Sequence, residues 1–152
     1  MATGPPDNFL SACFSYPVAF TMETSPRHQA RERALSLMYE AELKGDTPSV
    51  ILAALMVPPD PYTVELLTAV EERQAEIDGL IGAAAIGWDL DRMAVVDRNV
   101  LRLAVAELLH SSEVPTAVIL NEAVELASGY STDGSGRFVN GVLATLAGRI
   151  RD

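Results

Sequence analysis

The feature that most constrains the fold is the run of residues 114–147, in which apolar residues recur at helical spacing on both sides of a glycine-rich joint. In the first half, Pro115 suits the first position of a helix, where its missing N–H costs no hydrogen bond. Apolar side chains then cover most of the girth of this helix: Ala117, Ile119, Leu120, Ala123, Val124, Leu126 and Ala127. Such a pattern is typical of a core helix, and we expect the helix to end at Gly129.

The second half of this run predicts another helix after the joint. Asp133 or Ser135 can cap it, and its apolar stripe consists of Phe138, Val139, Val142, Leu143 and Leu146. Gly141 interrupts the stripe, although a glycine inside a helix costs about 1 kcal/mol relative to alanine. We therefore expect the backbone of another helix to approach closely at Gly141.

The rest of the chain also has helical rather than alternating periodicity. Ser25 with Pro26, and Thr47 with Pro48, have the residue types of an N-cap followed by a first helical position. Gly45 has the residue type of a C-terminal stop. Helical patterns cover residues 25–45, 47–56, 62–86 and 95–109. Because no convincing strand alternation is found, the sequence predicts an all-α fold.

Residues 1–24 differ in character from the remainder of the chain. They mix turn formers with scattered aromatic residues and contain neither lysine nor arginine. A secretory signal would need a positively charged start, which is missing here. We expect a disordered N-terminal extension over 1–24 and a helical domain over 25–152. An alternative for the first part is that the native protein starts at Met22.

The composition of the 152 residues limits the possible functions. A single cysteine, Cys13, excludes an internal disulfide framework and a multi-thiolate metal site. No apolar run is long enough to span a membrane. Glu122 and Glu125 lie one helical turn apart on a polar strip, where we expect them to be solvated. No other arrangement predicts catalysis, so neither an enzyme, a cofactor nor a metal site is expected.

The charge distribution nevertheless indicates a nucleic-acid partner. The net charge is −10, which by itself argues against phosphate binding. However, Arg27, His28, Arg31 and Arg33 gather at the start of the first helix. Arginine suits phosphate recognition and base stacking, and single-stranded RNA also uses aromatic platforms. Tyr39 and Phe138 are candidates for that role, with core packing as the alternative.

Three segments resemble the NusB family of bacterial transcription antitermination factors. They read RHQARERALSLMYEAE, VDRNVLRLAVAELLHSSEVPTAVILNEAVELASGYS and RFVNGVLATLA. The resemblance implies a compact domain of about seven helices, arranged as two packed three-helix lobes with a connecting element. It also implies a cytoplasmic protein that binds boxA-type RNA together with a small-subunit ribosomal protein, NusE. This pair would act with elongating RNA polymerase on ribosomal RNA operons.

The resemblance also implies which residues contact RNA. The arginine-rich start of the family's first helix falls on Arg27, His28 and Arg31, and its tyrosine falls on Tyr39. The acidic residue that opens the 95–109 helix is Asp97. At the joint, the family's usual Asp-Ser-x-Lys-Phe becomes GSGRF at 134–138. The implied RNA-binding residues are Arg27, His28, Arg31, Tyr39, Asp97, Ser135, Arg137 and Phe138.

One expectation and one alternative follow from these assignments. We expect the arginines of the first helix to lie beside the joint, and substitution of Arg27 and Arg31 by alanine to weaken RNA binding without affecting the fold. The alternative is a helical protein-interaction module, or a homodimer, without RNA affinity of its own. The net charge of −10 favours this alternative.

Overall fold

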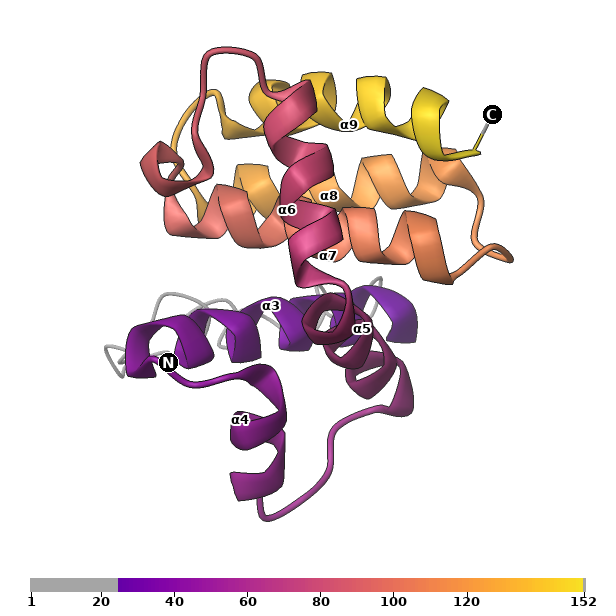
Figure 1. The fold of residues 1–152 in the computed structure, drawn as a ribbon. Coiled ribbons are helices and arrows are strands. Elements are labelled where there is room, and N and C mark those ends of the chain that lie inside the picture. The colour runs from indigo at the N-terminus through magenta and orange to yellow at the C-terminus, as the bar shows by residue number, and fades with distance from the viewer. Residues whose placement is uncertain (1–24, 152) are drawn as a thin grey trace, which may run out of the picture.

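The computed structural model describes residues 25–151, which form seven α-helices and one short 3-10 helix (Figure 1). In chain order these are α3 (Pro26–Lys44), α4 (Pro48–Ala54), α5 (Pro61–Glu72), α6 (Gln74–Ala84), η1 (Leu90–Arg92), α7 (Val95–His110), α8 (Thr116–Tyr130) and α9 (Ser135–Arg151). No strand occurs within this range, which confirms the predicted all-α fold. None of these helices is both long and apolar enough to cross a membrane. The two predictions for the N-terminal segment, a disordered extension and a start at Met22, lie outside the described residues.

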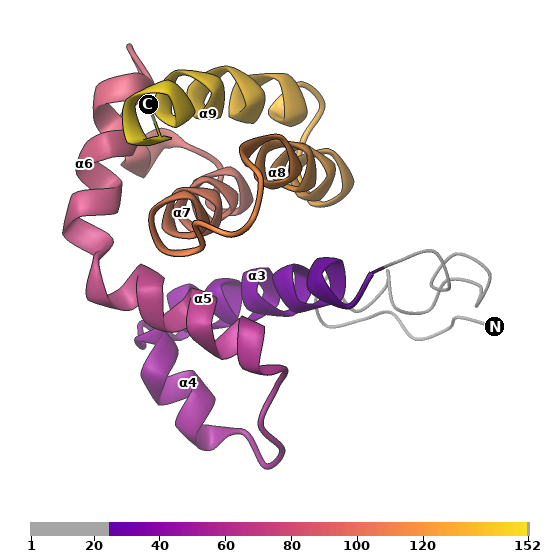
Figure 2. The ribbon, with the colours of Figure 1, turned by 90° about the vertical axis from the view of Figure 1, so that its right-hand side faces the viewer.

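The helices form two lobes of three helices each. Helices α3, α4 and α5 make the N-terminal lobe, and α7, α8 and α9 make the C-terminal lobe (Figures 1 and 2). Helix α6 runs from one lobe to the other along one side of the molecule. Its Ile77 and Ile81 are fully buried, so α6 belongs to the continuous core that both lobes share. The predicted arrangement of two three-helix lobes with a connecting element is confirmed.

Helix α7, rather than α8, is the central helix. Twelve of its sixteen residues are buried, including the polar Asp97, Asn99 and Glu107. Figure 2 shows α7 between α3 on one side and α8 and α9 on the other. Only four residues of α8 are buried: Ile119, Ala123, Leu126 and Ala127. Leu120 also packs against the core, so α8 is a core helix on one face. It is not buried around most of its girth, contrary to the prediction from the sequence, because Ala117 and Val118 are exposed.

The helix boundaries that depend on local chemistry were predicted correctly in the N-terminal lobe. The Ser25 hydroxyl accepts a hydrogen bond from the His28 backbone N–H at 3.0 Å, and Pro26 is the first residue of α3. Thr47 and Pro48 play the same parts for α4. Gly45 ends α3 in the left-handed region at φ 70°, where its N–H is directed to the carbonyl groups of Ala41 and Glu42.

Boundaries that depend on packing differ from the prediction. The single helix expected over 62–86 is broken at Arg73, where α5 ends and α6 begins. This break lets α5 remain in the N-terminal lobe while α6 crosses to the other. Pro115 stands just before α8 rather than inside it, and Gly129 lies inside α8, which continues to Tyr130.

The close helix approach occurs at Gly136 rather than at Gly141. A Cβ atom on Gly136 would lie 2.4 Å from the Ser128 Oγ and 3.4 Å from a methyl carbon of Val124. A Cβ atom on Gly141 would meet nothing within 4 Å. The expectation for Gly141 was wrong because that residue faces solvent, whereas Gly136 lies where α9 crosses α8.

A buried ionic network holds the two lobes together. Arg31 of α3 donates through Nε and Nη2 to Glu107 of α7, at 2.9 and 2.5 Å. The Tyr62 hydroxyl of α5 donates to the same carboxylate at 2.5 Å and lies 3.2 Å from the Ser111 hydroxyl. Arg31 is 5 % exposed and Glu107 is 2 % exposed. Because burial removes both charges from water, each depends on the other for its stability.

Substitution of Gly141 by alanine is expected to stabilise the protein. The site is exposed and sterically open, so alanine restricts the unfolded chain and favours the helix at no packing cost. We expect the free energy of unfolding to rise by about 0.5–1 kcal/mol in urea denaturation followed by circular dichroism. Gly136→Val should lower it, because the added side chain collides with α8. A loss of stability in Gly141→Ala would contradict the assignment of its surroundings.

Substitution of Arg31 is expected to destabilise the fold. The expectation from the sequence that alanine at this position leaves the fold unaffected is therefore wrong, because Arg31 is buried against Glu107. Arg31→Met leaves the Glu107 carboxylate buried without its cation, which costs about 3–5 kcal/mol. The double variant Arg31→Met with Glu107→Gln removes both charges and should be more stable than the single variant. Urea denaturation of all three proteins measures the difference. If the double variant were less stable than Arg31→Met alone, the ion pair would not be what holds these helices.

Candidate nucleic-acid interface

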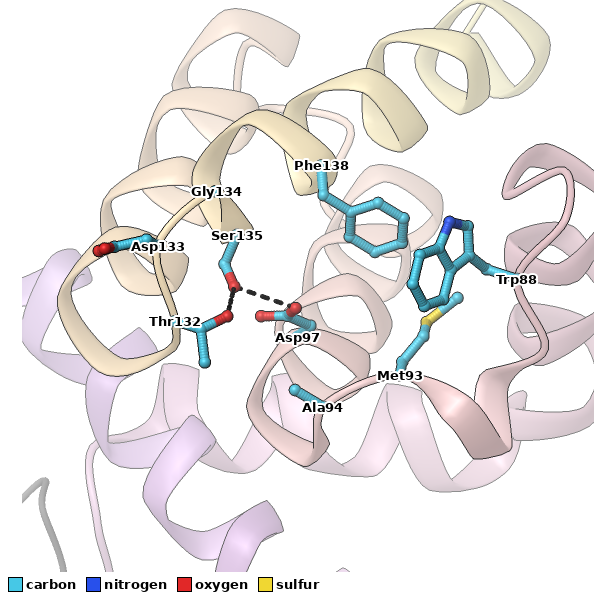
Figure 3. A pocket seen from close by; sticks show the side chains of 9 residues that line it. All are labelled: Trp88, Met93, Ala94, Asp97, Thr132, Asp133, Gly134, Ser135 and Phe138. Carbon is cyan, nitrogen blue, oxygen red and sulfur yellow. Dashed lines mark hydrogen bonds between the residues drawn. The ribbon is translucent and has the colours of Figure 1, made fainter.

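A cavity of about 210 Å³ opens at the joint between α8 and α9. Its lining comes from two segments that are distant in sequence: residues 88–97, which lead through η1 into the start of α7, and residues 132–138, which form the joint and the first turn of α9 (Figure 3). The lining residues are Trp88, Met93, Ala94, Asp97, Thr132, Asp133, Gly134, Ser135 and Phe138. The structure therefore brings together three residues that the sequence predicted separately: Asp97, Ser135 and Phe138.

Two aromatic rings form the apolar side of this cavity. Trp88 and Phe138 meet edge to face, with ring centroids 5.8 Å apart and an interplanar angle of 63°. Figure 3 shows both rings directed toward the opening, with Met93 beside them. Trp88 is 52 % exposed, so one partner of the pair is available to a ligand. Exposed aromatic faces are the usual platforms for unpaired bases.

The polar side of the cavity is a hydrogen-bonded carboxylate with one unused oxygen. Ser135, the first residue of α9, donates from its hydroxyl to Asp97 Oδ2 at 3.1 Å. The Ser135 hydroxyl also lies 3.1 Å from that of Thr132. Asp97 is 7 % exposed, and its Oδ1 has no hydrogen-bond partner among the described residues. An unpaired buried acceptor is costly, so this oxygen favours a ligand with an N–H or O–H donor.

The joint also offers a cation at a helix N-terminus. Gly134 adopts φ 88°, a conformation that few residues other than glycine tolerate. This turn directs the chain into α9. Arg137, in the first turn of α9, is exposed. The unpaired N–H groups of a helix N-terminus and a nearby guanidinium both favour a phosphate group.

The start of α3 has a different electrostatic character from the one the sequence indicated. Arg27 stacks over the Tyr62 ring at 4.0 Å, and its Nη1 lies 4.0 Å from Glu113. Arg31 is buried against Glu107 and also donates to Glu122 at 3.1 Å. Three cations, Arg27, His28 and Arg31, thus face five carboxylates: Glu32, Glu107, Glu113, Glu122 and Glu125. The cluster is acidic in sum.

His28 and Glu122 are half-buried rather than solvated. His28 Nδ1 lies 2.7 Å from Glu122 Oε1, and its Nε2 lies 3.6 Å from Glu32 Oε2. The hydrogen bond to Glu122, helped by the Glu32 carboxylate, raises the pKa of His28 to about 10. The expectation that Glu122 is solvated was wrong, because the side chains of His28 and Arg31 reach its carboxylate from α3. Glu125, one turn further on, is exposed as expected.

The first helix and the joint are linked rather than merged into one surface. Arg31 reaches α7 at Glu107, whereas the cavity lies at Asp97, ten residues earlier and about 15 Å along the helix axis. Between them, the hydroxyl of Tyr130 donates to Glu32 at 2.6 Å. Tyr39 lies three turns along α3 from Arg27, half-buried against the core.

Trp88 and Met93 are the large side chains of this cavity that the sequence did not single out; Ala94 and Thr132 were not singled out either. Both large side chains lie in an irregular segment between α6 and α7, where periodicity gives no indication of which side chains face inward. A large aromatic residue in a loop is the only signal that could have identified Trp88.

Comparison with known proteins agrees with this arrangement of helices. Residues 28–148 match the NusB family. The transcription antitermination protein NusB of Thermobifida fusca (strain YX) is 46% identical over 124 residues, which cover 79% of this chain and 87% of the relative. Among solved structures, NusB of T. maritima superposes with a TM-score of 0.76 at 32% identity, covering 85% of this chain and 95% of that one.

A second solved structure that is similar to this chain contains a partner protein and RNA. It is described as the antitermination factors NusB and NusE in complex with double-stranded RNA, and it superposes with a TM-score of 0.69 at 27% identity, covering 82% of this chain and 99% of that one. The family match extends over both lobes and includes the joint and the start of α3. This chain therefore belongs to the NusB family.

Proposed function

We propose that this protein is a cytoplasmic, non-enzymatic transcription antitermination factor that binds boxA-type RNA together with a NusE-type ribosomal protein. The pair would act on elongating RNA polymerase at ribosomal RNA operons. The observation that carries the proposal is the cavity at the α8–α9 joint, which combines exposed aromatic surface with an unused acceptor. The exposed Arg137 follows in the first turn of α9, outside the lining of the cavity. The names of the relatives support the same function, since they include an antitermination protein and a complex with NusE and RNA.

In this proposal a single-stranded segment of RNA is bound at the joint. A base stacks on Trp88 beside Phe138, while Asp97 Oδ1 accepts a hydrogen bond from an amino or imino group of that base. Ser135 holds the Asp97 carboxylate in place through its hydrogen bond to Oδ2. Arg137 and the first N–H groups of α9 bind the adjacent phosphate.

The residues of α3 divide into contacting and supporting roles. Arg27 is exposed and can still reach a phosphate from its position over Tyr62. We propose that Arg31 supports the surface through Glu107 and Glu122 instead of contacting RNA, since both carboxylates already engage its guanidinium. His28 is held against Glu122 in the same way. Tyr39 is partly exposed and has surface available for a base.

Variants of Trp88 and Arg137 should weaken RNA binding in two distinguishable ways. Trp88→Ala removes a stacking platform worth about 1–3 kcal/mol and leaves the salt dependence unchanged. Arg137→Gln removes a phosphate contact and should reduce the slope of log K against log salt by about 1. Filter binding of a boxA-type oligonucleotide at several salt concentrations measures both.

Two matched controls define what would contradict this prediction. Met56→Ala removes a fully exposed apolar side chain in the other lobe, and Arg149→Gln removes one positive charge from the opposite end of α9. Both should bind RNA as the unmodified protein does. If Arg149→Gln reduced the salt slope as much as Arg137→Gln, the joint would not be the RNA site.

The partner protein is expected to strengthen RNA binding. The chain has a net charge of −10, and its α3 cations are surrounded by carboxylates, so its own attraction for RNA is small. A basic ribosomal protein would add the missing positive charge. Titration of boxA-type RNA with and without the NusE-type protein tests this, and equal affinities in the two titrations would count against joint binding.

A protein-interaction role without RNA affinity is the second candidate. The link between α4 and α5 exposes 99% of Met56 and 76% of Val57, next to Val50 at 51%. Exposed apolar groups of this kind occur at protein interfaces. This role predicts binding of a partner or a second copy of the chain, with no RNA shift. A sizing column at several concentrations, run beside the RNA assay, separates the two candidates.

A further inference from the structure

We propose that His28, Glu122 and Glu125 form a binding site for a divalent transition-metal ion, such as Zn²⁺, where side chains of α3 and α8 meet. The inference goes beyond RNA binding and does not depend on it. His28 is in the first turn of α3, and the two glutamates lie three residues apart on one face of α8. The site would fasten the start of the first helix to the middle of another lobe's helix.

The three side chains lie close enough together for each to give one ligand atom to the same metal ion. One ligand atom of each lies within 4.8 Å of the other two. His28 Nδ1 is 2.7 Å from Glu122 Oε1 and 3.9 Å from Glu125 Oε1. Tetrahedral zinc with bonds of about 2.1 Å separates its ligand atoms by about 3.4 Å, so only small movements are needed. The Glu125 side chain is 68% exposed, and its 3.9 Å approach to His28 leaves it free to adjust.

The type of ligand atoms selects the class of metal. An imidazole nitrogen with two carboxylate oxygens suits zinc, manganese, cobalt or nickel better than magnesium or calcium, which prefer oxygen ligands alone. The presence of the imidazole also distinguishes this site from an ordinary cluster of surface glutamates, which has no ligand of that type.

The local charge favours a further cation. Around the site, Glu32, Glu107, Glu122 and Glu125 carry four negative charges, against two positive charges on a protonated His28 and Arg31. The net charge of these six side chains is therefore −2, and it is −3 when His28 is neutral. Arg31 donates to Glu122 Oε1, the same oxygen that faces His28. Arg31 keeps this hydrogen bond if the metal binds Oε2 of Glu122, because a carboxylate can give one oxygen to a guanidinium and the other to a metal.

The outer contacts of His28 are those of a metal-binding histidine. Its Nε2 is directed at Glu32 Oε2 at 3.6 Å, and the Tyr130 hydroxyl donates to that same oxygen at 2.6 Å. Metal-bound histidines usually present the second ring nitrogen to a carboxylate, which fixes the ring orientation. On binding, the metal takes the place of the proton on Nδ1, which is released to solvent, and the proton on Nε2 remains.

The test is a titration of the untagged full chain with ZnCl₂ by isothermal titration calorimetry in a non-chelating buffer. All proteins carry Cys13→Ser, so that no thiol competes for zinc. We expect saturable binding of one ion per chain. Glu125→Gln should weaken binding at least tenfold, and His28→Gln should abolish saturable binding. Glu32→Gln should weaken it about 10- to 100-fold, as loss of an outer carboxylate does.

Two control variants show whether the binding belongs to this site. His110→Gln removes the other histidine of the chain, and Glu113→Gln removes one exposed charge from the neighbouring loop. Both should bind zinc like the parent. The proposal would be overturned if the parent showed no saturable zinc binding. It would also be overturned if either control lost as much zinc affinity as Glu125→Gln.

Thermal unfolding gives a second measurement that does not depend on heat of binding. Zinc should raise the midpoint temperature of unfolding of the parent and leave the midpoint temperature of Glu125→Gln unchanged. Because the Glu125 side chain is exposed and, within residues 25–151, makes only the long ion pair with His28, this variant is expected to fold. An equal rise in both proteins would also overturn the proposal.

Discussion

The buried pair of Arg31 and Glu107 is the interaction on which the arrangement of the lobes depends. It joins α3 to α7, and the Tyr62 hydroxyl adds α5 to the same carboxylate. Nonspecific burial of apolar surface could place these helices at several relative rotations. A buried guanidinium satisfies its hydrogen bonds in only one of them, because any shift would leave a charge without a partner.

A second ionic contact fixes the opposite end of the same two helices. Arg98, near the start of α7, donates to Glu42, near the end of α3, and to the backbone carbonyl of Leu90. Arg102 holds Asp78 of α6 through two hydrogen bonds, at 2.8 and 3.0 Å. Helices α3 and α7 are therefore attached at both ends, and the cavity at Asp97 lies next to one of these attachments. The Arg98 guanidinium also donates to the backbone carbonyl of Met93, so the segment that carries part of the cavity wall is held against the start of α7.

How much of this could be predicted from the sequence depends on the range of the interaction. Ser25, Thr47 and Gly45 were assigned correctly, because caps and stops depend on a few adjacent residues. Gly136 and Gly141 were not distinguished, since only the crossing of α8 and α9 decides which glycine lacks space. Arg31 looked like part of a basic surface because its partner, Glu107, is 76 residues away. Among the residues that line the candidate cavity, those of the joint carried a motif, whereas Trp88 lies in a loop without periodicity.

The same long-range pairing explains how an acidic member of an RNA-binding family can keep arginines at the start of its first helix. In the sequence, Arg27, His28, Arg31 and Arg33 form a basic cluster. In the structure, Arg27, His28 and Arg31 each lie beside carboxylates, which come from α3, α7, α8 and the loop between α7 and α8. The positive electrostatic potential of these arginines is therefore weak at a distance of about 10 Å from the surface, which is the Debye length at moderate salt. In the proposed complex, the contacts left for RNA would be short-range: stacking at Trp88, one acceptor at Asp97 and the N-terminus of α9. Such contacts would discriminate among bases but attract RNA weakly, which is why the proposed function includes a basic partner.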